Sequence, residues 1–159
     1  MASLPLLFRP FEADRDTEAV VQLFRSNLDP YFIPEEEQEL RDFIAQPLRY
    51  FVAEIAAGHS ETGRLVAAGG YALNNPYAVL TWGMVDRKLH GQGLGRDFTV
   101  FRLNECRRAY PGKAIEIHTA QLTAGFYEKL GFRTLLVEKD KWAPGLDHCH
   151  MLLDADVNL

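Results

Sequence analysis

The chain of 159 residues is short of cysteine, of basic charge and of long apolar runs. Its two cysteines, Cys106 and Cys149, are too few for the framework of a disulfide-stabilised secreted domain. The 17 lysine and arginine residues are outnumbered by 22 acidic ones, and the net charge of −5 argues against a nucleic-acid partner, because phosphate binding needs a cationic surface. No run of about 18 apolar residues exists, so we expect neither a membrane span nor a membrane partner.

The first ten residues lack the cationic start and the long apolar stretch of a secretory signal. Internal repeats and low-complexity segments are missing as well. What is there, 47% hydrophobic and 25% charged residues, is ordinary for a globular protein of this length. We therefore expect a single domain over residues 1–159, located in the cytoplasm with free thiols.

Three glycines mark the most informative segment, where an apolar run ending at Val85 is followed by a polar link and the sequence HGQGLG, residues 90–95. Helical patterning follows, with Leu94, Phe98 and Phe101 at spacings of four and three. Such a turn presents the unpaired first amides of a helix, and the positive end of its dipole, without side chains in the way. A phosphate or diphosphate is the expected ligand, and a plain tight turn is the alternative.

Two common phosphate motifs are excluded. A dinucleotide-binding fingerprint needs glycine three places after Gly93, where Arg96 stands, and the Gly-Lys-Ser or Gly-Lys-Thr triplet of a P-loop is missing. The sequence HGQGLG instead resembles the acyl-CoA diphosphate loop of the GNAT superfamily of N-acetyltransferases, with His90 where that family usually has arginine or glutamine. A second segment, FYEKLGF at residues 126–132, resembles the GNAT helix that carries a Phe-Tyr pair and ends at Gly-Phe.

The resemblance implies an α/β fold of the α+β kind. It has a mixed central sheet of about seven strands flanked by four helices, with the fourth and fifth strands splayed apart. Acetyl-CoA is the implied co-substrate, and its pantetheine arm is expected to bond to backbone groups near Met84 and Val85. The implied cofactor-binding residues are Met84, Val85, His90, Gly91, Gln92, Gly93, Leu94, Gly95, Arg96, Gln121 and Phe126.

Tyr127 matches the catalytic tyrosine of the family and is expected to protonate the departing thiolate, and a buried aromatic residue is the structural alternative. The base that removes the proton of the amine is less defined. His118 is the first candidate, because histidine titrates near neutrality and this one ends a strand with the alternating sequence AIEIH. Glu116 would share its face. Glu54, Asp86 and a water chain to solvent are further candidates.

Three further features of the sequence bear on the site. Many family members have asparagine seven places before the tyrosine, where this chain has Ala120, so the neighbouring Gln121 is assigned to the cofactor. His148 and His150 would project from one strand face, but the sequence places no third ligand, so no metal is expected and a surface or acceptor-site role is favoured. Cys106 is expected to be a small buried residue rather than an acyl-enzyme nucleophile.

The periodicity predicts the remaining elements. Strands are expected at 6–9, 50–56, 64–73, 77–85, 114–118, 134–137 and 148–153. Helices are expected at 14–28, from about 34, at 94–110 and at 123–130. The sequence DKWAPGLDH, between the last two strands, is predicted to be a loop.

The leading functional hypothesis is an acetyl-CoA-dependent N-acetyltransferase that acts on a primary amine by direct transfer in a ternary complex. A degenerate acyl-CoA-binding domain that serves as a sensor, and an acyltransferase for hydroxyl groups or longer acyl chains, are the alternatives. The acceptor, a small-molecule amine or a peptide amine, is not marked by any motif. A homodimer is suggested only by the resemblance to the GNAT family.

Overall fold

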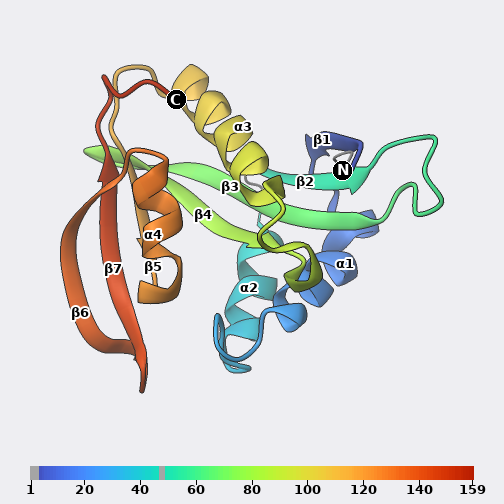
Figure 1. Ribbon diagram of the computed structural model, residues 1–159, viewed down its shortest axis with the longest axis horizontal. Coiled ribbons are helices and arrows are strands. Elements are labelled where there is room, and N and C mark those ends of the chain that lie inside the picture. The colour runs from blue at the N-terminus through green and yellow to red at the C-terminus, as the bar shows by residue number, and fades with distance from the viewer. Residues whose placement is uncertain (1–3, 47–48) are drawn as a thin grey trace. The chain divides into compact units, whose positions relative to one another are not determined.

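The computed structural model describes residues 4–46 and 49–159, which form two compact units. The first consists of the described residues of Met1–Gly70 together with Trp82–Arg102, and the second of Tyr71–Thr81 and Leu103–Leu159. The strands are β1 (Leu6–Pro10), β2 (Arg49–Ile55), β3 (Leu65–Asn74), β4 (Tyr77–Val85), β5 (Ile115–Thr119), β6 (Arg133–Ala143) and β7 (Leu146–Leu153) (Figure 1). The helices are α1 (Ala13–Ser26), α2 (Glu36–Ile44), the 3-10 helix η1 (Arg87–Leu89), α3 (Leu94–Ala109) and α4 (Gln121–Lys129).

The strands form one sheet of order β1-β2-β3-β4-β5-β7-β6. β1 is antiparallel to β2, and β7 is antiparallel to both β5 and β6, whereas β4 and β5 run parallel. The parallel pairs, Ala78 with Ile115 and Val79 with Glu116, lie near the starts of both strands, which is consistent with the predicted splay. The predicted mixed seven-stranded sheet with four α-helices is thereby confirmed.

Alternating residues of the central strands give the first unit two apolar faces. Val52 and Ala68 pack with the buried faces of α1 and α2, whereas their neighbours Ala53 and Ala67 pack with the first turns of α3. This is the alternation of side chains that a strand covered on both sides requires. None of the helices in the described residues combines the length and the apolar character that crossing a lipid bilayer requires.

A buried arginine occupies the middle of this unit. Arg102 on α3 is 1% exposed and donates from Nη2 to the backbone oxygen of Gly70 at 3.0 Å. A Cβ atom at Gly69 or at Gly83 would lie 2.5 Å from the guanidinium group, so both glycines leave space that Arg102 fills. The glycines of β3 predicted a bulge or a close backbone approach, and the approaching group is this charged side chain.

Gly70 is a glycine of β3 at which a side chain has no room. A Cβ atom there would collide with the backbone oxygen of Arg49, and only a shift of the β2 backbone relieves that contact. We expect Gly70→Ala to lower the free energy of unfolding by about 3 kcal/mol, measured by urea denaturation followed by circular dichroism.

Gly125 supplies the matched control for this prediction. It is an exposed residue of α4, and a Cβ atom added there meets nothing within 4 Å. Alanine is the better helix former, so Gly125→Ala is expected to raise the free energy of unfolding by about 1 kcal/mol. Equal effects of the two alanines would contradict the packing argument.

The C-terminal hairpin of the second unit corrects one prediction. The sequence DKWAPGLDH is not a loop, because β6 continues to Ala143 and β7 begins at Leu146, so Trp142 lies on a strand. β6 is an edge strand of the sheet, and most of its side chains are exposed. Its pairing with β7 is also interrupted at Thr134/Leu136 and at Glu138/Ala143. An exposed, bulged edge strand has little apolar alternation by which the sequence could mark it.

Candidate active site

The glycine loop of the first unit has the geometry of an anion site. Gly91 and Gly93 have φ angles of 79° and 83°, and a Cβ atom at either would meet nothing within 4 Å. The amide of Asp97 bonds to the Gly93 oxygen at 3.1 Å, and the amides of the preceding first turn have no acceptor within the helix. Left-handed glycines and free helix amides together suit a phosphate group.

His90 is held by the protein itself. Its Nε2 lies 3.0 Å from the Val85 oxygen, and its ring meets the Tyr31 ring edge-on at 5.3 Å. The same Val85 oxygen accepts from Asn27 Nδ2 at 2.9 Å. Where the family usually has arginine or glutamine, this chain therefore has a side chain that braces the end of β4.

Two of the carboxylates considered as bases have structural partners. Glu54 Oε1 accepts from Arg9 Nε at 2.6 Å. Asp86 pairs with Arg64, and its Oδ1 accepts from the Lys88 amide at 3.0 Å, which caps η1. Each of these two carboxylates therefore has a structural ion-pair partner in the first unit.

Tyr127 lies near the end of α4 in the second unit and is 8% exposed. Its backbone oxygen accepts from the Phe132 amide at 3.1 Å, and the Gly131 amide donates to the backbone oxygen of Glu128 at 3.0 Å. Gly131 has a φ angle of 105°, so the predicted left-handed helix cap is confirmed. The Tyr127 ring packs edge-on against Phe126 and Phe132, which fixes its orientation.

Gln121, assigned to the cofactor, bonds to the turn between β6 and β7. Its Nε2 donates to the Gly145 oxygen at 2.7 Å, and its Oε1 accepts from the Asp147 amide at 2.8 Å. Phe126, also assigned to the cofactor, is half-buried and lies 5.0 Å from the Tyr127 ring. The cofactor roles of both residues stay predictions.

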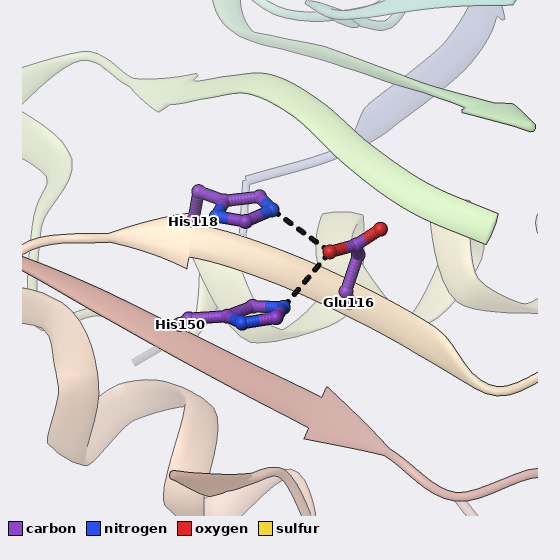
Figure 2. Close-up of side chains that lie close together, drawn as sticks. All are labelled: Glu116, His118 and His150. Atoms are coloured by element: carbon purple, nitrogen blue, oxygen red, sulfur yellow. Dashed lines mark hydrogen bonds and ion pairs between the residues drawn. The ribbon is translucent and has the colours of Figure 1, made fainter. Parts of the chain in front are cut away.

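The second unit also brings together four residues that we call the histidine cluster: Glu116, His118, His148 and His150. His118 Nε2 and His150 Nε2 each lie 2.8 Å from the same oxygen, Glu116 Oε1. Figure 2 shows both imidazole rings pointing a nitrogen toward the same carboxylate oxygen, which lies beside the pair of rings. Those rings, one from β5 and one from β7, are stacked at 4.4 Å with a 9° interplanar angle.

The cluster continues through the other nitrogen of His118. Nδ1 lies 2.8 Å from His148 Nε2, and His148 Nδ1 lies 3.2 Å from Glu138 Oε1. Burial lowers the pKa of His118 below its ordinary value, although the hydrogen bond with Glu116 opposes the shift. Both ring nitrogens of His118 are engaged, so one contact must be released before this residue takes a proton from an acceptor. Its role as the base stays a prediction.

The sequence predicted that Glu116 shares a strand face with His118, and His148 with His150, but not that the two pairs meet. Asn74 Nδ2 donates to Glu116 Oε2 at 2.6 Å, and His150 stands opposite His118 in the pairing of β5 with β7. The available signal was that three of the five histidines fall between residues 118 and 150. Using it requires the strand order, which places β7 beside β5.

The fold is shared with solved N-acetyltransferases. The ribosomal-protein-S18-alanine N-acetyltransferase from Escherichia coli has a TM-score of 0.75 at 17% identity, covering 97% of this chain and 96% of that one. A GCN5-related N-acetyltransferase from Kribbella flavida has a TM-score of 0.71 at 20% identity, covering 94% and 97%. An aminoglycoside 6'-N-acetyltransferase complexed with coenzyme A has a TM-score of 0.70 at 14% identity, covering 96% and 99%.

The family of the chain is shown by comparing its sequence with models of protein families. The model of the acetyltransferase (GNAT) domain matches residues 30–155. The chain therefore belongs to the GNAT acetyltransferase family. No curated protein matches the sequence.

Proposed function

We propose that the protein moves an acetyl group from acetyl-CoA to a primary amine by direct transfer in a ternary complex. The observation that carries this proposal is the open glycine loop at the start of α3, in a chain that belongs to the GNAT family. The resemblance of the segment ending at Gly131 and Phe132 supports it. A small-molecule amine or a peptide amine is the proposed acceptor, since the relatives named above carry such substrates in their names.

The cofactor is proposed to bind through backbone groups. The amides of residues 91–96 would hold the diphosphate, aided by the dipole of α3 and by the exposed Arg96. Backbone groups of Met84 and Val85 would hold the pantetheine arm. His90 would contribute its main chain, since its ring is bonded to Val85.

The chemistry is a nucleophilic attack on a thioester. The amine nitrogen attacks the carbonyl carbon, a C–N bond forms, the C–S bond breaks, and the thiolate takes a proton from Tyr127. An alkyl ammonium group has a pKa near 10.4, so its proton must first leave, to His118 or to water. A backbone N–H of Met84 or Val85 would stabilise the carbonyl oxygen as charge develops on it.

Two measurements test the proposal. Titration calorimetry with coenzyme A should give saturable heat, because the loop is formed in the folded protein. Incubation with acetyl-CoA and a panel of polyamines, aminoglycosides, amino acids and peptide α-amines should release free thiol in step with acetylated amine identified by mass spectrometry. No heat with coenzyme A in several buffers would remove both the cofactor and the activity.

The same measurements separate the alternative, a catalytically degenerate module that binds acyl-CoA as a sensor. Two differences from the usual family sequence, His90 and Ala120, favour this alternative. The Gln121 side chain, which was assigned to the cofactor, is also already bonded to the turn between β6 and β7. Such a module would give heat with coenzyme A but no thiol release above the rate without an amine.

A further inference from the structure

Neutral rings cannot satisfy all hydrogen bonds of the histidine cluster. An ionised carboxylate only accepts, and a neutral imidazole has one N–H and one lone pair. His148 Nδ1 faces Glu138 Oε1, so it carries the proton of that ring and leaves Nε2 as an acceptor toward His118. His118 then donates from Nδ1, and its Nε2 lone pair points at Glu116 Oε1 from 2.8 Å. Two lone pairs in contact call for a cation between them.

We propose that Glu116 Oε1, His118 Nε2 and His150 Nε2 bind one Zn²⁺ ion. Their ligand atoms lie within 4.8 Å of one another, and both nitrogens face the same oxygen (Figure 2). Two imidazole nitrogens and one carboxylate oxygen form a known zinc ligand set that leaves a fourth position open. Tetrahedral zinc separates its ligand atoms by about 3.4 Å, so each 2.8 Å contact opens by roughly half an ångström on binding.

The surroundings orient these ligands as a metal site requires. Asn74 holds the second oxygen of Glu116 at 2.6 Å. With zinc on His118 Nε2, its Nδ1–H donates to His148 Nε2, and His148 Nδ1–H donates to Glu138, so both rings are neutral and each contact holds one proton. A zinc-bound His118 has no free ring nitrogen, so the proton of the acceptor amine then leaves to water. A metal-bound histidine that passes its other N–H toward a carboxylate is the usual support of such sites. The charges of Glu116 and Glu138 balance those of the ion.

Zinc can reach this site from solvent. The Glu116 side chain is 5% exposed, whereas the side chains of His118 and His150 are 35% and 20% exposed. The carboxylate therefore lies at the bottom and the imidazole rings form the entrance. Because the side chains of His118 and His150 are partly exposed, we expect the chain to fold when either of them is replaced.

Zn²⁺ binding is measured by equilibrium dialysis and calorimetry on the full chain, prepared without a histidine tag and stripped of metal with a chelator. We expect one Zn²⁺ per chain. His150→Gln and His118→Gln should each weaken binding more than about 100-fold, because they remove a ligand, and His148→Phe by about 10–100-fold, because it removes only support. His59→Ala, which removes a histidine of the β2–β3 connection, should bind as the wild type does.

Circular dichroism and thermal unfolding establish that each variant is folded. Wild-type protein that takes up no Zn²⁺ would overturn the proposal, because a proton would then be the cation in the cluster. Unchanged Zn²⁺ affinity in both His118→Gln and His150→Gln would overturn it too, because the ion would then lie elsewhere. The binding measurement does not depend on acetyl transfer, so its result is separate from that of the proposed function.

Discussion

Tyr127→Phe is expected to lower the turnover number about 100-fold or more and to leave the affinity for coenzyme A within about twofold. The change removes one hydroxyl group from a side chain whose ring is fixed by Phe126 and Phe132. The backbone bonds that end α4, from the Phe132 amide to the Tyr127 oxygen and from Gly131 to Glu128, do not involve that hydroxyl. We therefore expect these backbone bonds to persist in the variant.

The expected size follows from the proton balance of thiolate departure. A phenol has a pKa near 10 and an alkyl thiol one near 8.5, so full transfer of the proton to a free thiolate is uphill by about 2 kcal/mol. The hydroxyl of Tyr127 therefore helps most in the transition state, where charge develops on sulfur while the C–S bond is still breaking. Such positioned acids contribute about 10²–10⁴-fold in rate, and 100-fold corresponds to about 2.7 kcal/mol in activation free energy.

Single-turnover measurements of thiol release separate the chemical step from binding, and calorimetry gives the affinity. Tyr77→Phe is the matched control, because it removes the phenol of a residue at the start of β4 that is not among the residues assigned to the site. Turnover of Tyr127→Phe equal to that of Tyr77→Phe would leave Tyr127 only its packing role. A parallel fall in coenzyme A affinity would make it a cofactor-binding residue instead.

The sequence was most informative where local chemistry decides the structure. β4 runs from Tyr77 to Val85 as predicted, because its apolar residues are bounded by Pro76 and by a polar link. The left-handed cap at Gly131 also follows from local rules, since glycine adopts that conformation without steric cost. In both cases the signal lies within a few residues of the feature.

Features that depend on strand order were beyond such rules. β6 was predicted too short, because an exposed edge strand needs no apolar face. Arg102 fills space left by Gly69 and Gly83 on two different strands, so no single segment shows why either is glycine. The contact of His118 with His150 likewise exists because β7 pairs with β5, after β6 has been placed outside it.

Gly93→Asp is expected to weaken coenzyme A binding about 30-fold relative to Gly93→Asn. Gly93 has a φ angle of 83° and no atom within 4 Å of an added Cβ, and aspartate and asparagine tolerate this conformation better than other side chains. Both side chains also suit the residue before a helix, so α3 is expected to form in either variant. The two differ by one negative charge beside the amides that would hold the diphosphate.

That difference sets the expected magnitude. Two unit charges 4 Å apart near a protein surface repel by about 4 kcal/mol, and roughly half remains after screening, which gives the 30-fold ratio. Calorimetry at low and at physiological ionic strength should show the gap between the variants narrowing as salt rises. Equal affinities of the aspartate and asparagine variants at low salt would mean that the diphosphate binds elsewhere. The open loop would then be only the turn that joins β4 to α3.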